Sequence, residues 1–242
     1  MKKILISFSG RIKEEEITTN QHYISYGIIR DYDKEVVRLF KSAEKYNLDG
    51  CWGYTADWLM NLPWSENTLK VLSRPSYGWA FKSICVYDAL SMVDEGDQVL
   101  WVDSNDILTN DPQILFDFAQ KHGIYSHDHT PGFHATKFWT HRDMFINMGC
   151  DEEKYWEIPQ LQVNIMAFCK SPRVMEFVGE WVNHSTTYET MIQNIQPNLM
   201  GFQEHRHEQS VFTILMTKYN IPTTKGYPYM VAHEEMGINL EV

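Results

Sequence analysis

The chain has 242 residues, a formal net charge of -11 at pH 7 and 43% hydrophobic residues, of which many are aromatic. This length fits one large domain, residues 1–242, that can bury a sizeable core, and the apolar content excludes a disordered chain. The acidic balance leaves no electrostatic footprint for nucleic acid and disfavours a broad basic face for membranes.

The cysteines and the amino-terminal segment indicate a cytoplasmic protein. Cys51, Cys85, Cys150 and Cys169 are scattered without metal-binding spacing, so we expect reduced thiols. The apolar run Ile4–Phe8 is too short for a signal peptide, and no segment approaches the roughly 20 apolar residues of a membrane span. A peripheral position at the inner membrane face is compatible with this pattern.

Strand and helix signals alternate along the chain, which indicates an α/β layered domain. In chain order, the sequence predicts a strand at Lys3–Phe8, a helix with Asp33 as N-cap, a strand at Cys51–Tyr54, a helix at Lys82–Val93, a strand at Gln98–Val102, a helix from Asp111-Pro112 to Gly123, a helix from Ser171-Pro172, and a helix at Glu208–Tyr219. The inward helix faces should carry Val36, Val37, Phe40 and Ala43; Ile84, Tyr87, Leu90 and Val93; and Met175, Val178 and Trp181. Residues 10–32 and 58–79 lack a pattern, and we expect them to form loops over a site.

Polar side chains follow directly on the apolar strand Gln98–Val102, in the order Asp103, Ser104, Asn105 and Asp106. Ligands of open α/β sheets bind at the carboxyl ends of the strands, and carboxylates there suit Mg²⁺ or Mn²⁺ bridging a diphosphate. The alternative is that Asp103 and Asp106 merely cap a turn.

Several segments occur in the order found in one family. They are Arg74-Pro-Ser-Tyr-Gly-Trp-Ala-Phe-Lys82, Gly96-Asp97-Gln-Val-Leu-Trp-Val-Asp103, the group Lys137–Asp143, Gln162-Val-Asn-Ile and Phe177–Trp181, and His205-Arg-His-Glu-Gln-Ser210. This ordered set resembles the sugar-nucleotide glycosyltransferases of the GT-A fold, of the bacterial capsule and lipopolysaccharide, galactosyltransferase-like type. The resemblance implies a GT-A-like, Rossmann-type layered α/β domain with a mixed, mostly parallel central sheet and helices on both faces.

The resemblance also implies a divalent metal, Mn²⁺ or Mg²⁺. Asp103 would hold the ribose or the metal, and the third position of the Asp-x-Asp element, here Asn105, would hold the metal directly. An amide oxygen brings no charge, so metal affinity should fall unless Asp106 takes over. His233, near the carboxyl terminus, stands where such enzymes often supply a further ligand.

Four residues are expected to bind the nucleotide-sugar donor. Arg74 and Lys82 are candidate counter-charges for the diphosphate, because Arg offers a planar fork and Lys a point charge. Lys82 could instead be simply solvated, although a helix start disfavours a cation. Trp79 is the tryptophan expected near the site, and Ser7 in the first strand completes the set.

Glu208 is the candidate catalytic carboxylate, together with Asp103. It could act as general base on an acceptor hydroxyl, apart from the strand-end carboxylates, or could simply be a helix-start residue favoured by the dipole. His127-Asp-His129 and His205-Arg-His207 make zinc conceivable, but no third ligand is forced and a loop is the simpler interpretation.

We therefore expect a metal-dependent hexosyltransferase of polysaccharide biosynthesis. It would move a hexose from a nucleotide diphosphate sugar, with UDP favoured, to a carbohydrate or lipid-linked acceptor. One alternative is a catalytically inactive nucleotide-sugar-binding protein on the same fold, which Asn105 makes plausible. The other is a sugar-phosphate nucleotidyltransferase, for which Ser9-Gly10-Arg11-Ile-Lys13 is a faint echo of the usual Gly-rich basic loop.

Overall fold

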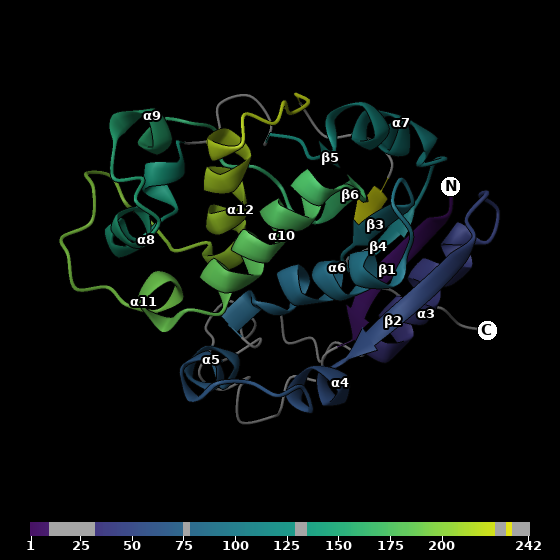
Figure 1. Cartoon of the computed structure of the whole chain (residues 1–242), viewed down its shortest axis with the longest axis horizontal. Coiled ribbons are helices and arrows are strands. Elements are labelled where there is room, and N and C mark those ends of the chain that lie inside the picture. Colours follow the sequence, from purple (N-terminus) through teal and green to yellow (C-terminus); the bar gives the residue numbers. More distant parts are fainter. Residues whose placement is uncertain (10–31, 75–77, 129–134, 226–230, 234–242) are drawn as a thin grey trace.

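A mixed five-stranded sheet forms the centre of the computed structural model, which describes residues 1–9, 32–74, 78–128, 135–225 and 231–233 (Figure 1). Its strands, in spatial order, are β2 (Gly50–Thr55), β1 (Lys3–Ser9), β3 (Gln98–Val102), β6 (Ile165–Cys169) and β5 (Ile124–Tyr125). β1 pairs in parallel with both β2 and β3, whereas β6 runs antiparallel to its neighbours β3 and β5. All strands except β6 therefore share one direction, which confirms the predicted mixed, mostly parallel sheet.

Each face of this sheet has its own hydrophobic core, because successive side chains of a strand point to opposite faces. On β1, Ile4, Ile6 and Phe8 belong to one core and Leu5 to the other. The first core lies under the helices α6 (Phe81–Met92), α10 (Pro172–Ser185) and α12 (His207–Lys218); the second lies under α3 (Tyr32–Ala43) and α7 (Gln113–His122). Helices thus cover both faces, as predicted.

Local signals placed several helix ends correctly. Ser171 caps α10 by accepting a hydrogen bond from the Val174 amide, and Pro172 follows at the first helical position. α7 stops at Gly123, whose φ of 91° is a left-handed conformation that glycine adopts without strain. β3 has the predicted bounds.

Three expectations about helices are wrong. α3 begins at Tyr32, so Asp33 lies inside the helix and is not its N-cap. Val37 and Tyr87 were predicted to face inward, but both are exposed, because other side chains of α3 and α6 form the buried faces of these helices. Residues 58–79 are not a continuous loop, since α5 (Glu66–Leu72) forms there and its N-cap Ser65 accepts from the Thr68 amide. The predicted loop at residues 10–32 lies almost wholly outside the described residues.

Shorter elements, none of them predicted, complete the described chain. They are α4 (Ala56–Met60), β4 (Asp106–Leu108), the 3₁₀ turn η2 (Thr136–Phe138), α8 (Arg142–Asn147), α9 (Glu153–Trp156), α11 (Tyr188–Met191) and β7 (Val231–His233). β4 and β7 form a separate antiparallel pair, and Figure 1 shows α8, α9 and α11 grouped on the far side of α12 from the sheet. The four cysteines are free thiols, as expected. In the described ranges, no helix has the length and apolar character needed to cross a bilayer.

Candidate active site

The polar run after β3 is a tight turn at the carboxyl end of the parallel strands. The Asp106 amide donates to the Asp103 carbonyl at 3.0 Å, and the Asp103 amide donates to the Asn164 carbonyl at 2.8 Å. The turn interpretation is therefore correct for the backbone. The turn does not involve the side chain of Asp103, which is 27% exposed and faces Lys82.

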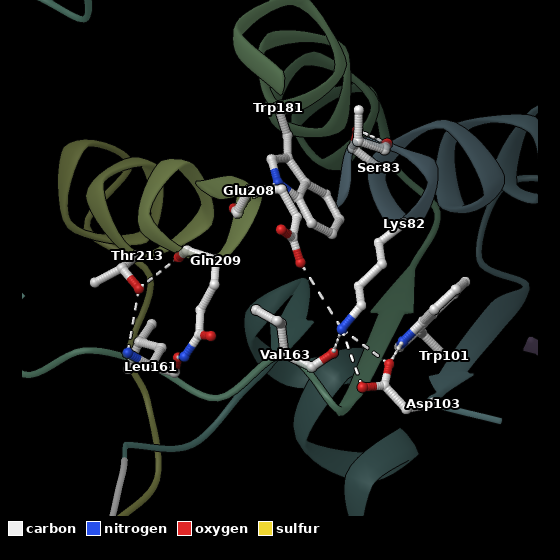
Figure 2. A network of polar contacts seen from close by, with 11 residues as sticks. Lys82, Ser83, Trp101, Asp103, Leu161, Val163, Trp181, Glu208, Gln209 and Thr213 are labelled. Carbon is white, nitrogen blue, oxygen red and sulfur yellow. Dashed lines mark hydrogen bonds and ion pairs between the residues drawn. The ribbon is translucent and has the colours of Figure 1, made fainter. Parts of the chain in front are cut away.

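Asp103 and Lys82 form a close ion pair, as Figure 2 shows. The Lys82 Nζ lies 2.9 Å from Asp103 Oδ1 and 3.1 Å from Oδ2. The indole N–H of Trp101 donates to Oδ1 at 2.8 Å, and the Val163 carbonyl accepts from the ammonium at 3.4 Å. Lys82 is only 5% exposed, which rules out the alternative of a solvated lysine. Its ammonium faces Asp103 inside the protein.

A left-handed backbone segment sets the start of α6 and hence the position of Lys82. Gly78 has φ 57° and Trp79 has φ 62°, a conformation that costs a non-glycine residue energy. A Cβ at Gly78 would lie 2.7 Å from the Cγ1 of Val71, so only glycine fits there. Trp79 is partly buried, with its ring 6.2 Å from that of Phe81. This places Trp79 three residues from the lysine, on the same helix start.

Glu208 joins the same cluster from α12. Its Oε1 lies 3.8 Å from the Lys82 Nζ, and its side chain is 4% exposed. The indole N–H of Trp181 donates to the Glu208 carbonyl at 3.1 Å (Figure 2). The residue before Glu208, His207, has φ 45°. Glu208 is remote in sequence from the strand-end carboxylates, but α6 and α12 bring it and Asp103 to the same ammonium. We call Lys82, Asp103 and Glu208 the central cluster.

Burial determines the charges in the central cluster. It raises the pKa of Glu208 to about 8, against the opposing effect of the Lys82 ammonium. Burial alone would lower the pKa of Lys82, but the nearby acidic groups, Asp103 first, outweigh it and raise that pKa. Because Asp103 already neutralises the ammonium, Glu208 is the group that keeps its proton. At neutral pH the cluster thus holds one cation, one anion and one mostly protonated acid.

The expected metal ligands other than Asp103 have contacts of their own in the described part of the chain, and the side chain of His233 lies outside it. Asp106 is 2% exposed, and its Oδ2 accepts from the Asn164 amide at 2.9 Å. The main-chain oxygen of Asn105 accepts from the Arg38 guanidinium at 3.1 Å. The backbone of His233 pairs opposite Asp106 in the β4–β7 ladder. Among the residues described, no group of three or more His, Cys, Asp or Glu side chains could hold a metal ion.

Two expected donor-binding residues lie away from the central cluster's ion pairs. Ser7 is fully buried in β1, and its hydroxyl donates to the Val102 carbonyl at 2.8 Å, so it joins two strands and offers no surface to a ligand. Arg74 is exposed, just after α5 and immediately before residues 75–77, which lie outside the description.

The histidine motifs behave differently from one another. His127 is buried, and His129 lies outside the described residues, so that pair stays a prediction. The rings of His205 and His207 meet edge to face at 4.7 Å, and the ring of His141 stacks on His205 at 3.9 Å. Burial lowers the pKa of His207 to about 4 and that of His205 well below its ordinary value, so both rings are neutral. No local pattern indicates that His141 joins them.

Tryptophan N–H groups are the contacts that sequence reasoning missed. Trp101 stands two residues before Asp103, a spacing that puts both on one side of an extended chain and could have indicated the contact. Trp181 is fully buried, which confirms its predicted place in the core. Its hydrogen bond to Glu208 depends on how α10 packs on α12, and no local pattern encodes that.

No protein-family model and no curated protein matches the sequence. Solved structures similar to this chain include the apo form of the glycosyltransferase GlyE of Streptococcus pneumoniae TIGR4, with 12% identity, a TM-score of 0.45 and coverage of 92% of this chain and 45% of that chain. A glycosyltransferase involved in the glycosylation of the major capsid of PBCV-1 has 12% identity, a TM-score of 0.45 and coverage of 95% and 83%. Apo mouse xyloside xylosyltransferase 1 has 12% identity, a TM-score of 0.43 and coverage of 93% and 85%. The chain thus spans about half the length of the GlyE structure.

Proposed function

We propose that this chain is a glycosyltransferase of the GT-A type, which moves a hexose from a nucleotide diphosphate sugar to a carbohydrate or lipid-linked acceptor. UDP is the proposed nucleotide, because the sequence motifs resemble those of enzymes with galactosyl- and glucosyl-type donors. The proposed setting is polysaccharide biosynthesis in the cytoplasm, with a peripheral position at the inner membrane face for a lipid-linked acceptor.

The central cluster is the observation that supports this proposal. Asp103 stands at the carboxyl end of β3, where open α/β sheets bind ligands, and α6 and α12 bring Lys82 and Glu208 to it. A buried ion pair beside a protonated carboxyl is a costly arrangement, which proteins concentrate at functional sites. Trp79, partly exposed at the start of α6, offers an aromatic face for the donor near this cluster.

The reaction makes one bond and breaks one. An acceptor hydroxyl oxygen bonds to the anomeric carbon of the hexose, while the bond between that carbon and the diphosphate oxygen breaks, so the nucleoside diphosphate leaves. The acceptor proton passes to a base, for which Glu208 is the candidate once it is ionised. Since the pKa of Glu208 is about 8, the rate should rise with pH up to that value.

A nucleotide-sugar-binding protein without turnover is the second candidate. Asn105 in place of an acidic residue and the buried position of Glu208 favour it. Donor hydrolysis and transfer separate the two candidates, since both would bind the donor and only the enzyme would release free UDP.

A thermal-shift screen tests the proposal. UDP, GDP, CMP and TDP sugars are compared with and without Mn²⁺, and binding to the folded state stabilises it by about 2.7 kcal/mol at a ligand concentration of about 100 times Kd. We expect the midpoint to rise with the UDP sugar. A rise with another nucleotide alone would overturn the choice of UDP, and no rise with any of them would overturn the donor site. Asp103→Ala should abolish turnover while the circular dichroism spectrum stays that of the parent.

A further inference from the structure

The central cluster places a cation against Asp103, one of the residues expected to hold a metal. We propose that the buried Lys82 ammonium takes the electrostatic place of a divalent metal, so that this site binds a nucleotide diphosphate without one. The inference rests on the proposed function, because it concerns the same donor site.

The contacts of Asp103 support this proposal first. The ammonium lies 2.9 Å and 3.1 Å from its two carboxylate oxygens, and the Trp101 indole donates to one of them at 2.8 Å. A divalent ion on this carboxylate would come close to an ammonium whose side chain is only 6% exposed. Like charges repel strongly where water and salt do not screen them. The Lys82 ammonium also donates to the Val163 carbonyl at 3.4 Å.

The neighbouring oxygen groups do not compensate for this repulsion. Glu208 faces the same ammonium at 3.8 Å and is buried, and Asn105 supplies a neutral amide. Asp106 is nearly inaccessible and accepts from Asn164. Mg²⁺ and Ca²⁺ take about six or more oxygen ligands, usually with several from carboxylates and water. Among the described side chains, which do not include that of His233, no three from His, Cys, Asp or Glu gather for such an ion.

Lys82 can perform the task that a metal would have. Its charge compensates that of Asp103, so the Asp103 carboxylate repels an approaching diphosphate less strongly. Asp103 keeps 27% of its side chain exposed and can still accept a hydrogen bond from a sugar hydroxyl. A fixed, poorly hydrated cation also stabilises the charge that develops on the departing diphosphate.

Calorimetric titration of the full chain with UDP tests the inference. The protein is first freed of metal with EDTA, and UDP is then titrated in EDTA and in Mn²⁺. We expect the two Kd values to agree within about threefold, which is under about 1 kcal/mol. Lys82→Met removes the charge and keeps the apolar stem, and it should weaken UDP binding by about tenfold or more in EDTA. Lys82→Arg should retain binding better than Lys82→Met, and Lys70→Met, an exposed lysine of α5, is the matched control that should bind as the parent does.

The outcomes separate this inference from the proposed function. UDP binding that requires Mn²⁺ would overturn the inference and leave the donor site intact. UDP binding that survives Lys82→Met unchanged would also overturn it. Mn²⁺ that tightens UDP binding by Lys82→Met but not by the parent would support it, because the two cations would then compete for one place. No binding of UDP or of another nucleotide in either buffer would remove both the inference and the proposed function. If Lys82→Met does not fold, the comparison of buffers on the parent still decides.

Discussion

Replacing Glu208 with Gln should make the protein more stable, by an amount that grows as the pH rises. Gln has nearly the size and hydrogen-bonding pattern of a protonated Glu, so the packing against α10 and Lys82 is preserved. It differs in that it never titrates. The substitution therefore isolates the free energy that the native state loses by burying an ionisable carboxyl.

The magnitude follows from the pKa of Glu208. Burial raises this pKa from 4.5 to about 8, whereas the carboxyl of the unfolded chain is exposed and keeps its ordinary value. Between these two values the native state binds more protons than the unfolded state, so the parent loses stability as the pH rises through that window. At about 1.4 kcal/mol for each pKa unit, the loss reaches at most about 5 kcal/mol above about pH 8 and is nearly absent below about pH 4.5.

Thermal unfolding of the parent and Glu208→Gln across this pH range measures the effect. For a chain of this size, about 1 kcal/mol shifts Tm by about 2–4 °C, so the gap between variant and parent should widen by roughly 8–16 °C between about pH 5 and about pH 9. Glu176→Gln is the matched control, since Glu176 is exposed on α10 and the same group is changed. Its difference from the parent is the baseline against which the gap of Glu208→Gln is compared.

Two results would refute this reasoning. A gap that does not change with pH would mean that Glu208 titrates alike in the folded and unfolded chain. A variant that is less stable than the parent at high pH would mean that Glu208 is ionised and stabilised by Lys82, with Asp103 not sufficient as the counter-charge of the ammonium.

Three further predictions follow from the site and its supports. Gly78→Ala should destabilise the fold by on the order of 2–4 kcal/mol, because it combines a left-handed backbone with a clash against Val71. The control Gly96→Ala, with φ 86° and no atom within 4 Å of the new Cβ, should lose only the backbone part of about 1–2 kcal/mol. Equal losses of the two variants in urea unfolding would contradict the clash. His207→Asn should reduce the stability that the protein loses on acidification, by at most about 3 kcal/mol between about pH 6.5 and about pH 4, because burial lowers the pKa of His207 to about 4. Asn tolerates the φ of 45° at this position. Parallel curves of Tm against pH for parent and variant would disprove this. Asp103→Asn should lower donor hydrolysis by about 10² or more when assayed well below its Tm, and it should also lower Tm, because the buried Lys82 ammonium loses its closest carboxylate; unchanged hydrolysis would remove Asp103 from the active site.

The sequence was sufficient where structure depends on neighbours in the chain. The apolar run Gln98–Val102 became β3 with the predicted bounds, and Ser171 and Gly123 marked a helix start and a helix end as predicted. Caps, turns and buried strands are set by a few adjacent residues, so their signals can be read locally.

Pattern reading was less successful where a helix is covered from several sides. α6 packs on the sheet and on α10, and it buries Lys82, Ser83, Cys85, Val86 and Ala89 together with Ile84, Leu90 and Val93 of the predicted face. A single apolar stripe therefore described this helix poorly, and Tyr87, assigned to the buried face, is exposed. The strand β6, inserted antiparallel between β3 and β5, was missed for a related reason: its short apolar run is consistent with either a strand or a buried helix segment.

The candidate site shows the same division. The sequence by itself singled out Asp103, Lys82 and Glu208 as chemically notable, each from its own local motif. Only the tertiary structure decided that the three meet, because the meeting depends on how α6 and α12 pack over the carboxyl end of β3. It also decided their charges, since a pKa is set by burial and by neighbours that are distant in sequence. Lys82 was expected to be a counter-charge for the diphosphate, but in the structure it neutralises Asp103, and burial keeps the neighbouring Glu208 protonated.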